Sequence, residues 1–73
     1  MMAQFLKIRN GITYAYIQCF NVVDANSTLL RINKSDIALV LDIAKHMSIN
    51  EKMYKILLRG QLYLTVTRDM VLE

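Results

Sequence analysis

The chain has 73 residues, of which 55% are hydrophobic and 21% are charged, and it carries a formal net charge of +3 with an isoelectric point near 9.3. This length predicts a single domain over residues 1–73. The mild positive charge excludes an acidic mimic of DNA and is compatible with phosphate contacts. The apolar fraction exceeds what so short a chain is expected to bury, which predicts either a homodimer or association with a larger host protein.

One cysteine, Cys19, is present, so no internal disulfide can form and a reducing, cytoplasmic setting is expected. No apolar segment approaches the roughly 20 residues that a membrane-spanning helix needs, and the first residues lack the apolar run of a signal peptide. The chain has two glycines and no proline, so no segment is typical of a linker. We therefore expect a cytoplasmic protein with no membrane partner.

The first predicted element is a β-hairpin over residues 5–17. Asn10-Gly11 separates two alternating runs, and this pair favours a two-residue type I′ turn, in which both central residues have φ > 0. That turn would place Lys7 opposite Tyr14. Alternation then divides the hairpin into an outer face (Phe5, Lys7, Arg9, Ile12, Tyr14, Tyr16) and a core face (Leu6, Ile8, Thr13, Ala15, Ile17).

The outer face of this hairpin combines aromatic rings with cations. Tyr14 and Tyr16 offer rings on which bases stack, while Lys7 and Arg9 can neutralise phosphates, as on surfaces that bind single-stranded nucleic acid. Alternatively, the rings are ordinary cross-strand partners, which stabilise a sheet by roughly 0.2–1 kcal/mol per pair without any ligand. A third interpretation is that a second copy of the chain covers this face.

The middle of the chain predicts two strands and then a helix. Residues 12–23 predict one long strand that ends at the turn-prone segment 24–27, and residues 28–32 predict a short third strand. A helix is predicted from Ser35 to Met47, because Ser35 is a suitable N-cap and the apolar residues that follow have helical spacing. These apolar residues are Ile37, Val40, Leu41, Ala44 and Met47, with Leu39 and Ile43 widening the stripe.

Residues 48–60 allow two interpretations. A capping box over residues 48–51 and apolar residues at helical spacing favour a second helix that ends at Gly60. Alternatively, Arg59-Gly60 is the turn of a hairpin, although Arg is unusual at the first position of a type I′ turn. We expect the helix, followed by an alternating strand over residues 61–67.

These elements predict an α+β fold, in which an N-terminal β-hairpin or small antiparallel sheet packs on one central amphipathic helix, with a short second helix and a late strand. Residues 68–73 are typical of a helix start that Thr67 would cap, yet the chain ends within its second turn. This ending indicates either a flexible tail or a fragment of a longer protein.

No group of residues indicates catalysis or metal binding. His46, the only histidine, lies where a helix C-terminus would favour its positive charge, and Cys19 lies on a predicted core face. Asp36 and Asp42 would lie on different faces of the predicted helix, so they cannot form a paired-carboxylate site. We expect no enzyme, no metal site and no cofactor.

A second cationic surface follows from the predicted second helix. Lys52, Lys55 and Arg59 recur at i, i+3 and i+7, which places them along one stripe of a helix. Such a stripe is usually the solvated side of an amphipathic helix, but it can also contact phosphates. The predicted nucleic-acid-binding residues are therefore Lys7, Arg9, Tyr14, Tyr16, Lys52, Lys55 and Arg59.

Over residues 30–73, the order of predicted elements resembles the start of the winged-helix domain of replication-initiator proteins from small plasmids and related phages. The resemblance rests on the apolar helix over residues 36–47, the strand over 62–67 and the helix start over 68–73. In that family the next two helices form the helix-turn-helix that enters the major groove, and this sequence has no counterpart of them. The resemblance implies a shortened relative or a fragment that dimerises or modulates DNA binding.

The sequence thus predicts a non-enzymatic, nucleic-acid-associated regulatory or replication accessory protein that is dimeric. The alternative is a small phage-type or plasmid-type protein-interaction module, whose aromatic strand face or sheet edge binds and modulates a host protein. The two functions differ in their response to salt, because only phosphate contacts weaken steeply as the salt concentration rises.

Overall fold

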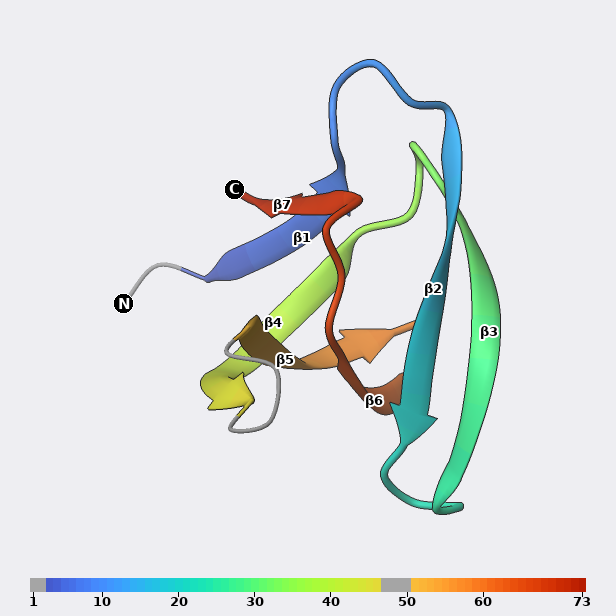
Figure 1. Cartoon of the computed structure of the whole chain (residues 1–73), viewed down its shortest axis with the longest axis vertical. Coiled ribbons are helices and arrows are strands. Elements are labelled where there is room, and N and C mark those ends of the chain that lie inside the picture. The colour runs from blue at the N-terminus through green and yellow to red at the C-terminus, as the bar shows by residue number, and fades with distance from the viewer. Residues whose placement is uncertain (1–2, 47–50) are drawn as a thin grey trace.

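The computed structural model of this protein describes residues 3–46 and 51–73. Within these residues there is no helix, and seven strands form one antiparallel sheet that curls into a half-barrel (Figure 1). In space the strands lie in the order β3-β2-β6-β5-β4-β1-β7. They are β1 (Gln4–Ile8), β2 (Tyr14–Asn21), β3 (Asn26–Asn33), β4 (Ala38–His46), β5 (Glu51–Leu58), β6 (Gln61–Thr65) and β7 (Met70–Leu72).

The predicted N-terminal hairpin is wrong, because β1 and β2 do not pair with each other. β1 pairs with β4 and β7, whereas β2 pairs with β3 and β6. Gly11 has a φ of 97°, but Asn10 is not among the residues with positive φ, so the type I′ geometry is absent. Instead, Ile12 N–H donates to the Arg9 carbonyl at 3.4 Å, and the turn carries the chain to another part of the sheet.

The alternation predicted for these two strands is nevertheless confirmed. Leu6 and Ile8 of β1 are buried, as are Ala15 and Ile17 of β2. Tyr14 and Tyr16 are exposed on the opposite face, and Phe5 lies at the margin of exposure. Which face each side chain occupies is a local property of a strand, and it does not depend on which strand lies beside it.

The α+β fold is also wrong, because the predicted central helix is strand β4. Ser35 lies in a turn, and the Asp36 carboxylate accepts a hydrogen bond from the Asn33 N–H at 2.8 Å rather than stabilising a helix N-terminus. The pairing of β4 with β5 steps from Val40–Ile56 to Asp42–Lys55 and leaves Leu41 as the extra residue of a bulge. The bulge interrupts the period-2 alternation, so the apolar residues of β4 acquire a helix-like spacing.

The predicted second helix is strand β5 as far as the described residues reach, and residues 48–50 of that prediction lie outside them. The hairpin interpretation is confirmed, since Arg59 and Gly60 join β5 to β6 with φ values of 53° and 75°. Two consecutive positive φ values are the signature of a type I′ turn. The predicted C-terminal helix start is β7; Thr67 Oγ1 accepts a hydrogen bond from Asp69 N–H at 3.2 Å, but a strand follows.

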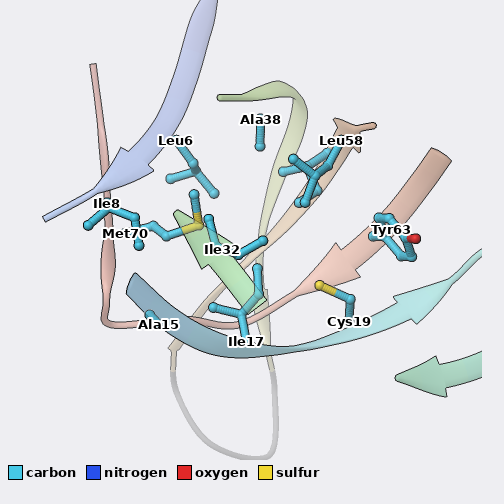
Figure 2. Packing of buried hydrophobic residues seen from close by; sticks show 11 residues of the cluster. Leu6, Ile8, Ala15, Ile17, Cys19, Ile32, Ala38, Leu58, Tyr63 and Met70 are labelled. Atoms are coloured by element: carbon cyan, nitrogen blue, oxygen red, sulfur yellow. The ribbon is translucent and has the colours of Figure 1, made fainter. Parts of the chain in front are cut away.

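The core lies inside the curled sheet, and all seven strands contribute to it (Figure 2). Leu6, Ile32 and Ile56 have exposed fractions of 0% and come from strands far apart in the sequence. The remaining core residues are Ile8, Ala15, Ile17, Cys19, Ala38, Leu58, Tyr63 and Met70. Burial of one face leaves the convex outer face of the sheet to solvent.

β2 and β3 form a hairpin along one side of the molecule, with β3 at the edge of the sheet (Figure 1). They pair without a register shift from Tyr14–Asn33 to Asn21–Asn26. The turn between them is fixed by Asn21, whose side-chain oxygen accepts hydrogen bonds from the N–H groups of Val23 and Asp24 at 2.9 and 3.0 Å. Because the described residues contain no helix, none of them offers a helix that could cross a membrane.

Candidate functional site

The outer face of the β2–β3 hairpin carries a continuous row of large exposed side chains. From β2 come Tyr14, Tyr16, Gln18 and Phe20, since every second residue of a strand points outward. Their register partners on β3 are Asn33, Arg31, Leu29 and Ser27. We call these eight residues the β2–β3 strip. Tyr16 and Leu29 remain 54% and 60% exposed, which is unusual for side chains of this size.

Two tyrosines and an arginine form a stack at one end of the strip. The Tyr14 and Tyr16 rings meet edge to face, with their centroids 5.9 Å apart and their planes at 89°. Arg31 lies directly opposite Tyr16 and reaches diagonally across, so that its Cζ is 4.5 Å from the centroid of the Tyr14 ring. This cation–π contact holds a positive charge beside the exposed Tyr16 ring.

Arg31 has no carboxylate within ion-pair distance among the described residues. Its charge is therefore not neutralised by a neighbouring side chain. An arginine held on a ring but without a counter-ion can contact a phosphate or stack on a base, because its planar guanidinium does both.

A shallow groove of about 330 Å³ adjoins the Phe20 end of the strip. It exists because β6 pairs with β2 only between Cys19–Thr65 and Asn21–Tyr63. Beyond Thr65 the chain leaves β2, and Thr65 Oγ1 donates to the Gln18 carbonyl at 2.9 Å. The groove is lined by Gln18, Phe20, Ser27, Met53, Leu64, Thr65 and Val66.

Lys7 and Arg9, which the sequence placed beside the tyrosines, lie elsewhere. β6, β5 and β4 separate β1 from β2 in the order of the sheet. Lys7 Nζ is 3.1 Å from a carboxylate oxygen of Glu73, and Arg9 Nη2 is 3.9 Å from Asp69 Oδ1. Both cations thus lie against carboxylates of the C-terminal segment and are not brought to the tyrosines.

Lys52 and Lys55 do not share a stripe, because residues three apart on a strand point to opposite faces. Lys52 lies opposite Lys45, and Lys55 lies on the other face opposite Asp42. The helical spacing from which the second cationic surface was predicted is therefore absent. Both lysines stay in the predicted set of nucleic-acid contacts, but the structure groups neither of them with Tyr14.

Arg59 is engaged by two acceptors at the β5–β6 turn. Its Nη2 donates to Asp36 Oδ2 at 2.9 Å and to the Arg31 carbonyl at 2.7 Å. The hydrogen bond from Arg59 holds the pKa of Asp36 below its usual range, and the hydrogen bond from Asn33 N–H lowers it further. The carboxylate in turn raises the pKa of Arg59. Arg59 thus connects the β5–β6 turn to the edge of the β2–β3 hairpin.

Of the seven predicted contacts, the structure brings together Tyr14 and Tyr16. It adds Arg31 and Phe20, which were absent from the predicted set. The signal for Phe20 was present, since alternation along the long strand predicted over residues 12–23 puts it on the face of Tyr14. Arg31 follows only if that strand pairs with the next one, because it reaches the rings from across the hairpin.

The sequence also singled out two other reactive residues, Cys19 and His46. Cys19 is fully buried, and that burial raises the pKa of its thiol, although a hydrogen bond with Thr65 and the charge of Arg59 act in the opposite direction. His46 ends strand β4 rather than a helix. Among residues 3–46 and 51–73, no three His, Cys, Asp or Glu residues lie close enough together to hold a metal ion.

No family model matches the chain, and no match was found among curated proteins or solved structures. No comparison therefore bears on the resemblance to the winged-helix domain. The helix from which that resemblance was argued is strand β4 as far as the described residues reach. What remains is the chemistry of the β2–β3 strip itself.

Proposed function

We propose that this protein is a non-enzymatic, cytoplasmic protein that binds single-stranded nucleic acid on the β2–β3 strip, in a regulatory or replication accessory role. The observation that carries the proposal is the stack of Tyr14, Tyr16 and Arg31 on an exposed strand face. Two half-exposed rings beside a cation that has no counter-ion among the described residues are an arrangement by which sheets bind single strands without reading their sequence.

The geometry of a strand supports this function. Tyr14 and Tyr16 are two residues apart and therefore lie about 7 Å apart along β2. An extended single strand that runs along β2 would meet one ring after the other, and each base stacked on an aromatic ring contributes roughly 1–3 kcal/mol. Arg31 would supply a phosphate contact, to which the net charge of +3 adds a weak long-range attraction.

A second candidate is a protein-interaction module. The observation that favours it is the groove beside Phe20, whose lining also includes the apolar Met53, Leu64 and Val66. An apolar side chain of a host protein could enter this groove while the rest of the partner covers the strip. The two candidates share Phe20 and Tyr16, but only the first predicts a strong dependence on salt.

The test is fluorescence anisotropy of a labelled 20-nucleotide single strand at several salt concentrations. Tyr16→Ala is expected to weaken binding about 5- to 150-fold, because one stacking contact of roughly 1–3 kcal/mol is lost. Tyr16→Phe keeps the ring and should bind nearly as well as the wild type. Arg31→Ala should make the negative slope of log K against log salt shallower by about 1, because one phosphate contact is lost.

Arg68→Ala is the matched control for Arg31→Ala. Its side chain is 86% exposed and pairs with Glu51, away from the strip, so its removal changes the net charge equally. Equal losses in Arg31→Ala and Arg68→Ala, or unchanged binding in Tyr16→Ala, would contradict the proposal. A protein captured by the wild type after nuclease treatment, but not by Phe20→Ala, would favour the second candidate.

A further inference from the structure

β3 is the edge strand of the sheet, and two hydrogen bonds show which of its backbone groups point away from β2. Asn33 N–H donates to the Asp36 carboxylate at 2.8 Å, and the Arg31 carbonyl accepts from Arg59 at 2.7 Å. Neither partner belongs to β2, so the backbone groups of residues 31 and 33 face outward. In an antiparallel pair this orientation alternates, so the N–H and C=O groups of Ser27 and Leu29 face outward as well.

The edge is therefore covered at one end and open at the other. Both backbone groups of Asn33 already have partners, because its N–H donates to the Asp36 carboxylate and its carbonyl accepts from the Asp36 N–H at 3.0 Å. The outward groups of Ser27 and Leu29 have no partner among the described residues. Unpaired backbone groups on a sheet edge form a template for another strand.

The open part of the edge lacks the features that usually prevent strand pairing. It contains no proline, no lysine and no bulge, and Leu29 is 60% exposed. Its one charged side chain, Arg31, folds back onto Tyr14 instead of projecting from the edge. A regular edge with so few of these features is expected to be covered by an extended chain.

We infer that β3 of a second copy covers this edge, antiparallel, with Leu29 facing Leu29 of the second copy. In this register Ser27 of each copy faces Arg31 of the other copy. The outward N–H and C=O groups that would form the new hydrogen bonds are unpaired within the described part of the chain, except the Arg31 carbonyl, which binds Arg59 but retains a second lone pair. The edge is therefore complementary to itself.

Neighbouring registers are worse for identifiable reasons. Centring the pair on Leu30 places Ser27 opposite Asn33, whose N–H already binds Asp36. Centring it on Arg31 places two arginines directly opposite each other, which is unfavourable. Centring the pair on Thr28 places Arg31 opposite Ala25, which lies in a turn, so Arg31 has no strand residue to pair with. Only the register centred on Leu29 pairs Ser27, Leu29 and Arg31 without a conflict.

Such a dimer would continue one sheet through two copies and place their β2–β3 strips side by side on one outer surface. The contact is limited to a short stretch of strand, so the dimer is expected to be weak and to depend on protein concentration. It does not rest on the proposed nucleic-acid binding, since neither copy needs a ligand to pair.

The register is tested by oxidising cysteine variants. Directly opposite residues in a hydrogen-bonded pair have Cα atoms about 5.5 Å apart, a distance that a disulfide spans, so Leu29→Cys is expected to cross-link two copies. Ser27→Cys is the control, since its own counterparts lie roughly 13 Å apart and should not cross-link. The double variant Ser27→Cys with Arg31→Cys should cross-link again. Native Cys19 is fully buried and does not compete.

Light scattering after gel filtration supplies the second measurement. The wild type is expected to approach twice its 8.5 kDa mass as concentration rises, and Leu29→Pro to remain monomeric, because proline removes an outward N–H that β2 does not use. Leu29→Lys tests the same edge if the proline variant fails to fold. A wild type that is monomeric at all concentrations, a dimer that persists in both variants, or equal cross-linking of Ser27→Cys would overturn the inference.

Discussion

Arg59 offers the sharpest test of how this half-barrel is held together. Its guanidinium lies 2.9 Å from the Asp36 carboxylate and 2.7 Å from the Arg31 carbonyl, so one side chain connects the β5–β6 turn, the edge strand β3 and the start of the β3–β4 connection. Arg59→Ala removes both contacts. The backbone strain at φ 53° is unchanged, because alanine tolerates positive φ no better than arginine.

The cost of this substitution can be worked out from the two contacts. An exposed ion pair contributes about 0.2–1 kcal/mol, and a hydrogen bond to a carbonyl about 0.5–1.5 kcal/mol. We therefore expect Arg59→Ala to lower the free energy of unfolding by about 1–2 kcal/mol. A chain of 73 residues is expected to have roughly 4–11 kcal/mol in total, so the loss is a substantial fraction.

The assay is urea denaturation of both proteins, monitored by circular dichroism. With a slope of about 1 kcal/mol per molar urea, the expected loss moves the midpoint down by about 1–2 M. The pH dependence has a definite sign. The folded-state pKa of Asp36 is lowered, so its contribution is complete above the unfolded pKa near 3.9 and is lost as the pH falls through the folded value.

The difference between wild type and Arg59→Ala should consequently be larger at pH 7 than at pH 2 to 3. Arg68→Ala is the control, because its ion pair with Glu51 involves a side chain that is 86% exposed and is expected to contribute little. A loss below about 0.3 kcal/mol, or a difference that is the same at pH 7 and at pH 2, would refute the assignment of Arg59 as a structural connection.

Three further predictions follow from burial and backbone conformation. Ile56 lies on the central strand β5 with an exposed fraction of 0%, so Ile56→Ala should lower the free energy of unfolding by about 2–5 kcal/mol. A loss below about 1 kcal/mol would contradict the burial of Ile56 in the core. Ala25 has a φ of 58°, so Ala25→Gly should raise the melting temperature through a gain of up to about 1 kcal/mol, and a lower melting temperature would count against that geometry. Cys19 should react with a thiol reagent only after urea unfolding, whereas rapid labelling of the native protein would show that the thiol is accessible.

The parts of the fold that follow from local alternation could be predicted from the sequence. Ala15, Ile17 and Cys19 point inward along β2, while Tyr14 and Tyr16 point outward, as the alternation indicates. The pattern also predicts the strand β6. These successes share one cause, because the side-chain period of a strand is independent of its partners.

β4 could not be predicted in this way, because a bulge interrupts the two-residue alternation of its side chains. Leu41 is the extra residue, and it moves Val40 and Ile43 onto one face although they are three positions apart. Spacing of this kind is what an amphipathic helix produces. Ser35 and Asp36 added to the error, since the residues that begin helices also form turns.

The pairing of β1 shows a different limit. Asn10-Gly11 is a strong local signal for a hairpin, yet β1 pairs with β4 and β7, which lie far away in the sequence. In these pairs Leu6 is fully buried and Met70 nearly so. Burial in a shared core outweighs the preference of one turn, and a single sequence gives no direct sign of such long-range pairing.

Within the candidate site, Arg31 separates the two proposals, because its side chain and its backbone face different surfaces. The guanidinium lies on Tyr14 on the outer face, whereas the carbonyl points off the sheet edge toward Arg59. Arg31→Ala removes the guanidinium and leaves the backbone carbonyl in place. It should weaken single-strand binding and lower its salt dependence while the concentration-dependent dimer persists.

Leu29→Pro makes the reciprocal change at the same edge. It should abolish the dimer while the stack of Tyr14, Tyr16 and Arg31 stays in place, so each copy would keep the stacking contacts that we propose for a single strand. Loss of both properties in both folded variants would mean that the β2–β3 strip and the β3 edge act as one surface. That result would contradict the independence of the two sites, which follows from the perpendicular directions of side chains and backbone groups in a strand.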